Sequence, residues 1–141
     1  MQRVQKVGHR TAIAAAIAAI VAVAWSASAL ALPAYSVHVN VVPSTLPVNM
    51  TFTVTAHGNS SNTSLLKVLL NRKSGCAHTA AQDAAHPGDS LKIDTMVTGA
   101  YSRSKTFTAK QGGRHWACAY LTSLPPSHFL RARADMAYLV D

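Results

Sequence analysis

Two histidines and two aspartates lie close together in one stretch of this 141-residue chain. They fall in the loop that we expect between Cys76 and Ser90, and they are His78, Asp83, His86 and Asp89. Imidazole and carboxylate groups are common zinc ligands and common general acids and bases. The two histidines are eight residues apart, whereas metal-binding pairs usually follow the shorter spacing H-x₃₋₅-H. We therefore expect solvated loop residues here. A small hydrolase or metal-binding protein with its site in the Cys76–Ser90 loop is the alternative interpretation.

No other pattern in the sequence indicates catalysis or a cofactor. The chain lacks the G-x-S-x-G nucleophile elbow, the phosphate-binding P-loop and the dinucleotide-binding glycine motif. Its five acidic residues are all Asp, which leaves few ways to build a pair of catalytic carboxylates. We expect no catalytic, cofactor-binding or metal-ligating residues, and so a protein that is not an enzyme.

The first 29 residues have the three parts of a secretory signal peptide. A basic start precedes an uncharged apolar run over residues 11–34, and small residues at A-x-A spacing occur around Ala29 and Ala31. We predict cleavage after Ala29, with Ala31 as a second possible position. An uncleaved membrane anchor is the alternative, because about 20 apolar residues would span a bilayer. The sequence thus predicts a secreted or cell-envelope protein, with no transmembrane span left after cleavage.

The two cysteines of the chain, Cys76 and Cys118, both lie in the predicted mature part. An exported chain with an even number of cysteines usually pairs them, and two cysteines allow one intramolecular pairing. A redox or metal-binding thiol pair would need a C-x-x-C motif or histidines at ligand spacing near both residues. The sequence therefore predicts a structural disulfide between Cys76 and Cys118.

The charge of the chain favours a solvated basic surface, with acidic partners as the alternative interpretation. It has 13 Lys and Arg against 5 acidic residues, and loss of Arg3, Lys6 and Arg10 with the signal leaves a net charge of +5. A basic surface can attract an anionic cell-envelope polymer or an acidic protein, although it also simply keeps a small protein soluble. We do not expect nucleic-acid binding, because no aromatic stacking platform accompanies the charge in the sequence.

The mature chain alternates apolar and polar residues in short runs, which is typical of β-strands that bury one face. Polar residues from Gly58 to Ser64 predict a loop, and Gly99 predicts a turn. Without long amphipathic helices for parallel crossovers, the strands should pair antiparallel in a two-layered sandwich. Seven strands are expected, over residues 36–41, 50–57, 65–70, 91–98, 104–109, 115–121 and 131–140.

The run Gly-Gly-Arg-His-Trp-Ala-Cys-Ala-Tyr-Leu, from Gly112 to Leu121, resembles the sixth strand of an immunoglobulin-like sandwich. Trp116, two residues before Cys118, stands where that fold often has a conserved Tyr. The chain resembles small exported bacterial proteins with this fold and an aromatic-x-Cys-Ala-Tyr-Leu strand, mostly of unknown function. The resemblance implies an all-β, seven-stranded antiparallel immunoglobulin-like domain over residues 30–141, acting as a non-catalytic binding or structural module.

The sequence departs from the antibody-type pattern in the position of its cysteines. Residues 50–57, the expected second strand, contain no Cys, and the expected third strand contains no Trp. The first Cys comes only after the third strand. The predicted disulfide should therefore tie a loop or a strand end to the sixth strand, rather than join the two sheets.

Overall fold

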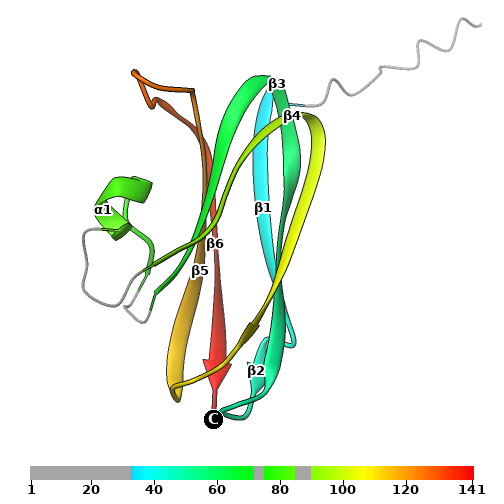
Figure 1. Cartoon of the computed structure of the whole chain (residues 1–141), viewed down its shortest axis with the longest axis vertical. Helices are drawn as coiled ribbons and strands as arrows, with labels where there is room; N and C mark the ends of the chain where they lie inside the picture. The colour runs from blue at the N-terminus through cyan, green and yellow to red at the C-terminus, as the bar shows by residue number, and fades with distance from the viewer. Residues whose placement is uncertain (1–32, 72–74, 85–89) are drawn as a thin grey trace, which may run out of the picture. The chain divides into compact units, whose positions relative to one another are not determined.

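The computed structural model describes residues 33–71, 75–84 and 90–141, with the side chains of residues 90 and 91 excepted. All of them belong to one compact unit, Ala31–Asp141. The predicted signal segment, its cleavage site and the candidates His86 and Asp89 lie outside the described residues. The elements are β1 (Tyr35–Val42), β2 (Thr45–Leu46), β3 (Thr51–Asn71), α1 (Ala80–Ala84), β4 (Ser90–Thr108), β5 (Gly113–Thr122) and β6 (Leu130–Val140) (Figure 1).

The expectation of seven strands is wrong, because two pairs of expected strands are each one continuous strand. β3 runs for 21 residues through the polar stretch expected as a loop, and β4 runs for 19 residues through Gly99. The polar stretch keeps its pairing with β1 and β4 as far as Ser60, and the ladder with β4 resumes at Ser64 after an irregularity. Ser60 and Ser64 are buried there with their hydroxyl oxygens 2.5 Å apart, and Ser60 donates to the carbonyl of Asn62 at 2.6 Å. Short polar side chains thus satisfy one another inside a bent strand.

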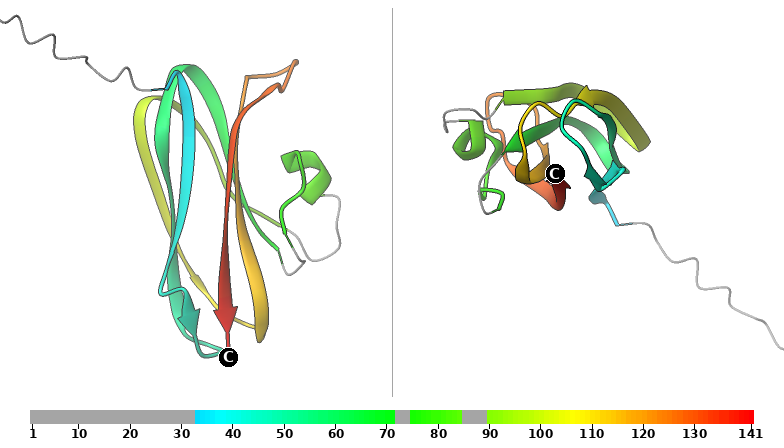
Figure 2. Two further views of the ribbon diagram at one scale, coloured as in Figure 1. Left: turned by 180° about the vertical axis from the view of Figure 1, so that it is seen from behind. Right: turned by 90° about the horizontal axis from the view of Figure 1, so that it is seen from below.

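The long strands β3 and β4 pass from one layer of the fold to the other (Figure 2). The first half of β3 pairs with β1 and with the second half of β4, while its second half pairs with the first half of β4 and with β5. β6 then pairs with β5, and β2 adds to β6 in parallel, so the sheet is not purely antiparallel. The result is one six-stranded sheet, folded over its core and nearly closed, in place of two separate sheets.

The core lies between the inner faces of this folded sheet. The predicted alternation is confirmed in β1 and in the first half of β3. Val37 and Val41 of β1 and Val54 of β3 are buried, while His38 and Asn40 are exposed. A second, smaller cluster lies outside the sheet, beneath α1. Its buried members are Leu69, Ala80, Cys118 and Tyr120, with Cys76 and Trp116 packed against them.

Gly58 of β3 occupies a place with no room for a side chain. A Cβ atom there would lie 2.1 Å from the carbonyl oxygen of Ser36 and 2.9 Å from the hydroxyl of Tyr101, which donates to that same carbonyl at 2.8 Å. Gly112, by contrast, has nothing closer than 3.5 Å to such an atom.

We therefore expect Gly58→Ala to destabilise the fold by about 3 kcal/mol, because backbone atoms of two strands must separate. The matched substitution Gly112→Ala should change stability by less than about 0.5 kcal/mol. Urea unfolding of the two variants measures the difference. Equal effects would contradict the close approach at Gly58.

Candidate functional site

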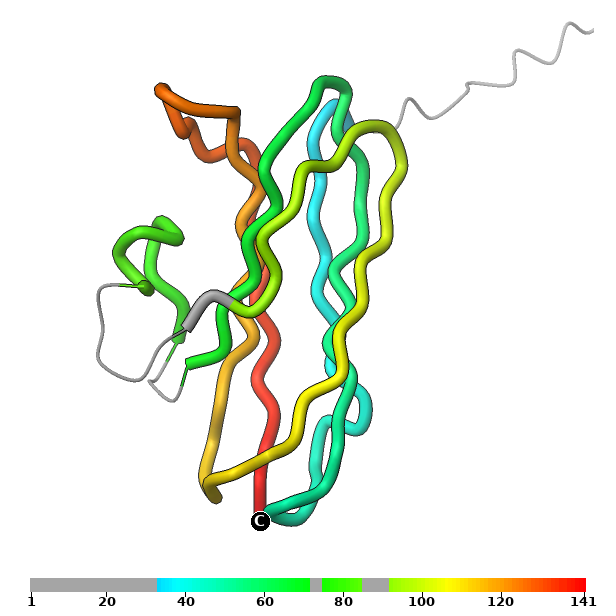
Figure 3. The backbone as a smooth tube through the Cα atoms, in the orientation of Figure 1, coloured from blue at the N-terminus to red at the C-terminus, as the bar shows by residue number. Residues whose placement is uncertain are grey.

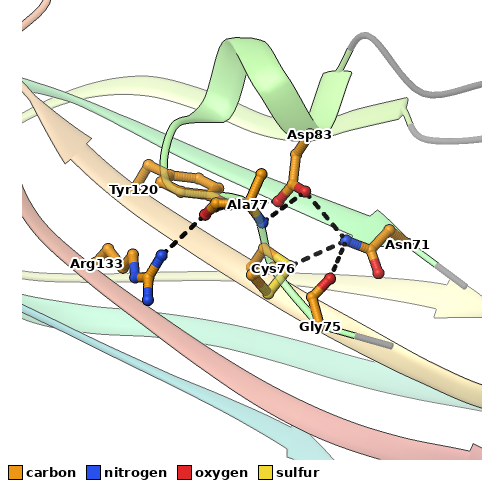
Figure 4. Close-up of a disulfide and its surroundings, with 8 residues drawn as sticks. Asn71, Gly75, Cys76, Ala77, Asp83, Tyr120 and Arg133 are labelled. Carbon is orange, nitrogen blue, oxygen red and sulfur yellow. Dashed lines mark hydrogen bonds between the residues drawn. A yellow bond between two sulfur atoms is a disulfide. The ribbon is translucent and has the colours of Figure 1, made fainter. Parts of the chain in front are cut away.

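Residues 75–84, which include α1, lie against the outer face of the sheet and are held there by a disulfide (Figure 4). α1 begins with a reciprocal cap between Thr79 and Gln82. The Gln82 amide N–H donates to the Thr79 hydroxyl and the Thr79 amide N–H donates to the Gln82 side chain, both at 3.2 Å. Cys76 and Cys118 are joined with their Cα atoms 5.7 Å apart. The disulfide ties this segment to β5 and leaves the two layers unlinked, as the positions of the cysteines predict.

Asp83, one of the sequence candidates for chemistry, is buried and serves to hold this segment. Its Oδ1 accepts from the Ala77 amide at 2.9 Å and from the Asn71 side chain at 3.4 Å, and its Oδ2 is hydrogen-bonded to the Tyr120 hydroxyl. Burial, and then the hydrogen bond to Asp83, raise the pKa of Tyr120 well above its usual value. The carboxylate thus has three partners inside the protein and sits 2% exposed.

Of the other candidates of this segment, His78 is the one that lies within the described residues, and it does not join Asp83 in a site. His78 is exposed, with its Nδ1 atom 3.5 Å from the guanidinium of Arg133. Cys76, Asp83 and Cys118 have possible donor atoms within 4.8 Å of one another, but both sulfurs are used in the disulfide. Cysteine binds a metal ion as a thiolate, and the disulfide leaves no thiolate here. This cluster is therefore a structural junction.

The basic residues of β6 are also engaged in the fold. Arg131 lies 4.5 Å from the ring of Tyr35 and donates to the Ser64 hydroxyl at 2.7 Å. Arg133 donates to the carbonyl of Ala77 at 3.1 Å. Both guanidinium groups hold neighbouring elements together, so they are less available to an anion from solution.

A cleft of about 530 Å³ opens between the beginning and the end of β4. β4 rises in one layer and descends in the other, so its two ends lie apart, as the olive and yellow parts of the tube in Figure 3 show. Within the described residues β4 pairs with β3 alone, which leaves its outer edge free. We call this opening the β4 cleft; it is lined by Phe52, Leu70, Lys92, Thr106, Phe107, Thr108, Ala109, Lys110, Gln111, His115, Tyr138 and Val140.

Four rings follow one another through the β4 cleft, each against the next. Phe107 lies 5.7 Å from Phe52, Phe52 lies 5.0 Å from Tyr138, and Tyr138 stacks on His115 at 5.3 Å, all measured between ring centroids. The ring nitrogen Nε2 of His115 is 2.9 Å from the carbonyl oxygen of Gln111, which fixes the ring. The site thus has an ordered aromatic wall with contributions from four strands.

Lysines surround this wall. Lys92 and Lys110 line the cleft, and Lys105 places its Nζ 5.7 Å from the centre of Phe107 while donating to the carbonyl of Lys92 at 3.1 Å. Among the described residues, those that line the cleft include no carboxylate and no thiol. The described lining thus combines positive charge with a partly exposed aromatic ring at Phe107.

Few features of the sequence indicated this cleft. Its members come from β3, β4, β5 and β6, and they meet only because β4 crosses between layers. The available signal was Phe107, the single large apolar residue in an otherwise polar and basic run.

Comparisons with known proteins do not assign the chain to a family. No family model and no curated protein matches it. Among solved structures it is similar to the CARDB domain of a Pyrococcus furiosus protein in complex with di-metal ions, at 14% identity over 77% of this chain and 94% of that one, with a TM-score of 0.47. It is also similar to superoxide reductase (neelaredoxin) from Ignicoccus hospitalis, at 14% identity over 76% of this chain and 81% of that one, with a TM-score of 0.47.

Proposed function

We propose that this chain is an exported, immunoglobulin-like module that binds, without catalysis, an acidic saccharide segment of a cell-envelope polymer in the β4 cleft. One observation carries the proposal: the aromatic wall and the lysines lie together at the cleft. Among the described residues that line it there is no carboxylate.

Charge supports an anionic ligand. Lys92 and Lys110 meet at the cleft from the two ends of β4 and its following loop, and Lys105 lies beside them. Of the described acidic residues, Asp83 is buried in the junction beneath α1 and none lines the cleft. A cavity lined by one sign of charge concentrates ligands of the opposite sign.

The aromatic wall supports a ligand with ring faces. Phe107 is half-buried, and the buried rings of Phe52 and Tyr138 lie tilted behind it, so Phe107 presents a firmly backed apolar surface in the opening. The apolar faces of sugar rings pack on such surfaces while their carboxylates remain free to meet the lysines. Among the described residues the outer edge of β4 pairs with no strand, and a long polymer could lie along it.

Export is proposed from the signal-like first 29 residues and from the disulfide, which persists in oxidising compartments. Among the described residues, no helix has the length and apolar content needed to cross a bilayer. We accordingly propose a secreted or cell-envelope location.

Calorimetric titration at low salt tests the proposed ligand. We expect an oligogalacturonate hexamer to bind, and neutral maltohexaose of the same length to bind much more weakly. The double variant Lys92→Gln/Lys110→Gln should weaken binding of the acidic probe by about tenfold, because charge-assisted contacts are lost. Added salt should reduce the remaining affinity.

The matched control is Lys67→Gln/Arg114→Gln, which removes the same net charge from residues that do not line the cleft. This variant should bind the acidic probe within about twofold of the wild type, since exposed charges act weakly at a distance. Equal losses in both double variants, equal binding of the two probes, or no binding of either probe would refute the proposed ligand.

A further inference from the structure

Two histidines face each other across neighbouring strands on the outer side of the sheet. His38 of β1 and His57 of β3 are direct partners in the antiparallel ladder, and their rings stack with centroids 5.3 Å apart and planes at 26°. β1 and β3 lie side by side in both views of Figure 2. Both side chains are exposed, so they meet in a position open to solvent.

Neither ring is committed to another group. In the part of the chain that the structure describes, the contact of His38 and His57 with each other is the only one that involves their ring atoms in a hydrogen bond, ion pair or stack. Each neutral imidazole therefore keeps one nitrogen lone pair available. Nothing in the described surroundings must be broken before these nitrogens can bind something else.

The surroundings suit a cation. The nearest charged group that a neighbouring contact records is Arg103, whose guanidinium donates to the backbone carbonyl of Ser102 at 2.9 Å. The described side chains directly next to the pair on this face are uncharged, so no carboxylate among them competes for a metal ion. They are Ser36, Asn40, Thr55, Asn59 and Ser102. The long ladders on both sides of β3 hold the two backbones at a constant spacing, which limits the ordering that binding requires.

We propose that His38 and His57 form a two-imidazole site for a divalent transition-metal ion, with Cu²⁺ bound more tightly than Ni²⁺ or Zn²⁺. Two rings stacked face to face can direct equivalent nitrogens at one ion after small rotations about their side-chain bonds. Imidazole suits these late first-row metals, and the order of affinity at a fixed donor set has Cu²⁺ at its maximum. Water completes the coordination at this exposed position.

Titration of the untagged protein with Cu²⁺ alone, followed by calorimetry, tests the site. The wild type should bind one ion per chain at the pair. His38→Asn and His57→Asn should each weaken that binding by roughly a hundredfold, because the second imidazole then no longer acts within the same molecule. His128→Asn is the matched control, because His128 is exposed and lies outside the pair, in the loop between β5 and β6. Its φ of 47° is one that Asn tolerates.

A chemical readout covers the case in which a variant fails to fold. Cu²⁺ should protect His38 and His57 of the wild type from diethyl pyrocarbonate, while His128 is still modified. Unchanged Cu²⁺ affinity in the folded double variant His38→Asn/His57→Asn would overturn the proposal. So would equal protection of all three histidines, or a failure of Cu²⁺ to protect His38 and His57.

Discussion

Removing the disulfide with Cys76→Ala/Cys118→Ala is expected to lower the free energy of unfolding by about 4 kcal/mol. The bond joins residues 42 apart in sequence, so it excludes many extended conformations from the unfolded chain. It also fastens the α1 segment to β5, where Cys118 is fully buried. The stability of a domain of this size is about 5–15 kcal/mol, so this loss would bring it close to unfolding. Urea unfolding monitored by circular dichroism gives the difference.

Thiol titration provides the control for this prediction. The wild type, unfolded without reductant, should show no free thiol, and reductant should release two. Reduced wild type should then unfold at nearly the same urea concentration as the double variant, since both lack the same constraint. Two thiols in the unreduced protein, or a difference below about 1 kcal/mol between variant and oxidised wild type, would contradict a stabilising bond.

Alkaline pH is expected to destabilise the protein by about 4 kcal/mol between pH 9 and pH 11. Burial raises the pKa of Tyr101 to about 12 and that of Tyr138 to about 12, and it raises the pKa of Tyr120 still further together with its bond to Asp83. Below pH 10 these phenols are protonated in both the folded and the unfolded state, so their burial contributes fully to the free energy of unfolding. Above pH 10 they ionise in the unfolded chain but keep their protons in the folded one, so rising pH favours unfolding by up to about 1.4 kcal/mol per group and pH unit.

Two single variants separate this effect from the titration of other groups. Tyr138→Phe should reduce the loss between pH 9 and pH 11 by about a third, because Tyr138 is one of three such buried phenols. Tyr35→Phe should not reduce the loss, because hydrogen bonds with Ser61 and Asn62 lower the pKa of Tyr35, so that its ionisation favours the folded state slightly. Denaturant unfolding at each pH measures these slopes. Equal slopes in wild type and Tyr138→Phe would show that its phenol ionises freely in the folded state.

The error in the number of strands shows where local composition misleads. Residues 58–64 contain Gly, Asn, Ser and Thr, which usually form loops because they satisfy their own backbone. Here the same residues pair with β1 and β4, and Ser60 and Ser64 bond to each other inside the bend. Pairing with distant strands outweighed the local preference, and no sequence window contains that information.

Trp116, Cys118 and Tyr120 show what alternation along a strand can reveal and what it cannot. Their alternation places them on one face of β5, as observed, but that face is the outer one and is covered by α1. The inner face of β5 carries Ala117 and Ala119, whose small side chains gave no signal of burial. Period-two alternation identifies a shared face without saying which layer covers it.

The sequence by itself determined what depends on neighbours along the chain or on simple counting. Alternation decided which residues of β1 and early β3 point inward, and two cysteines in a chain with a signal-like start allow one internal bond. The tertiary structure alone decided that Asp83 is buried, that His38 meets His57, and that four aromatic rings and three lysines gather at the β4 cleft. These sites join residues from different strands, and their positions follow from strand register and from the crossing of β4 between layers, which are set by the packing of the whole core.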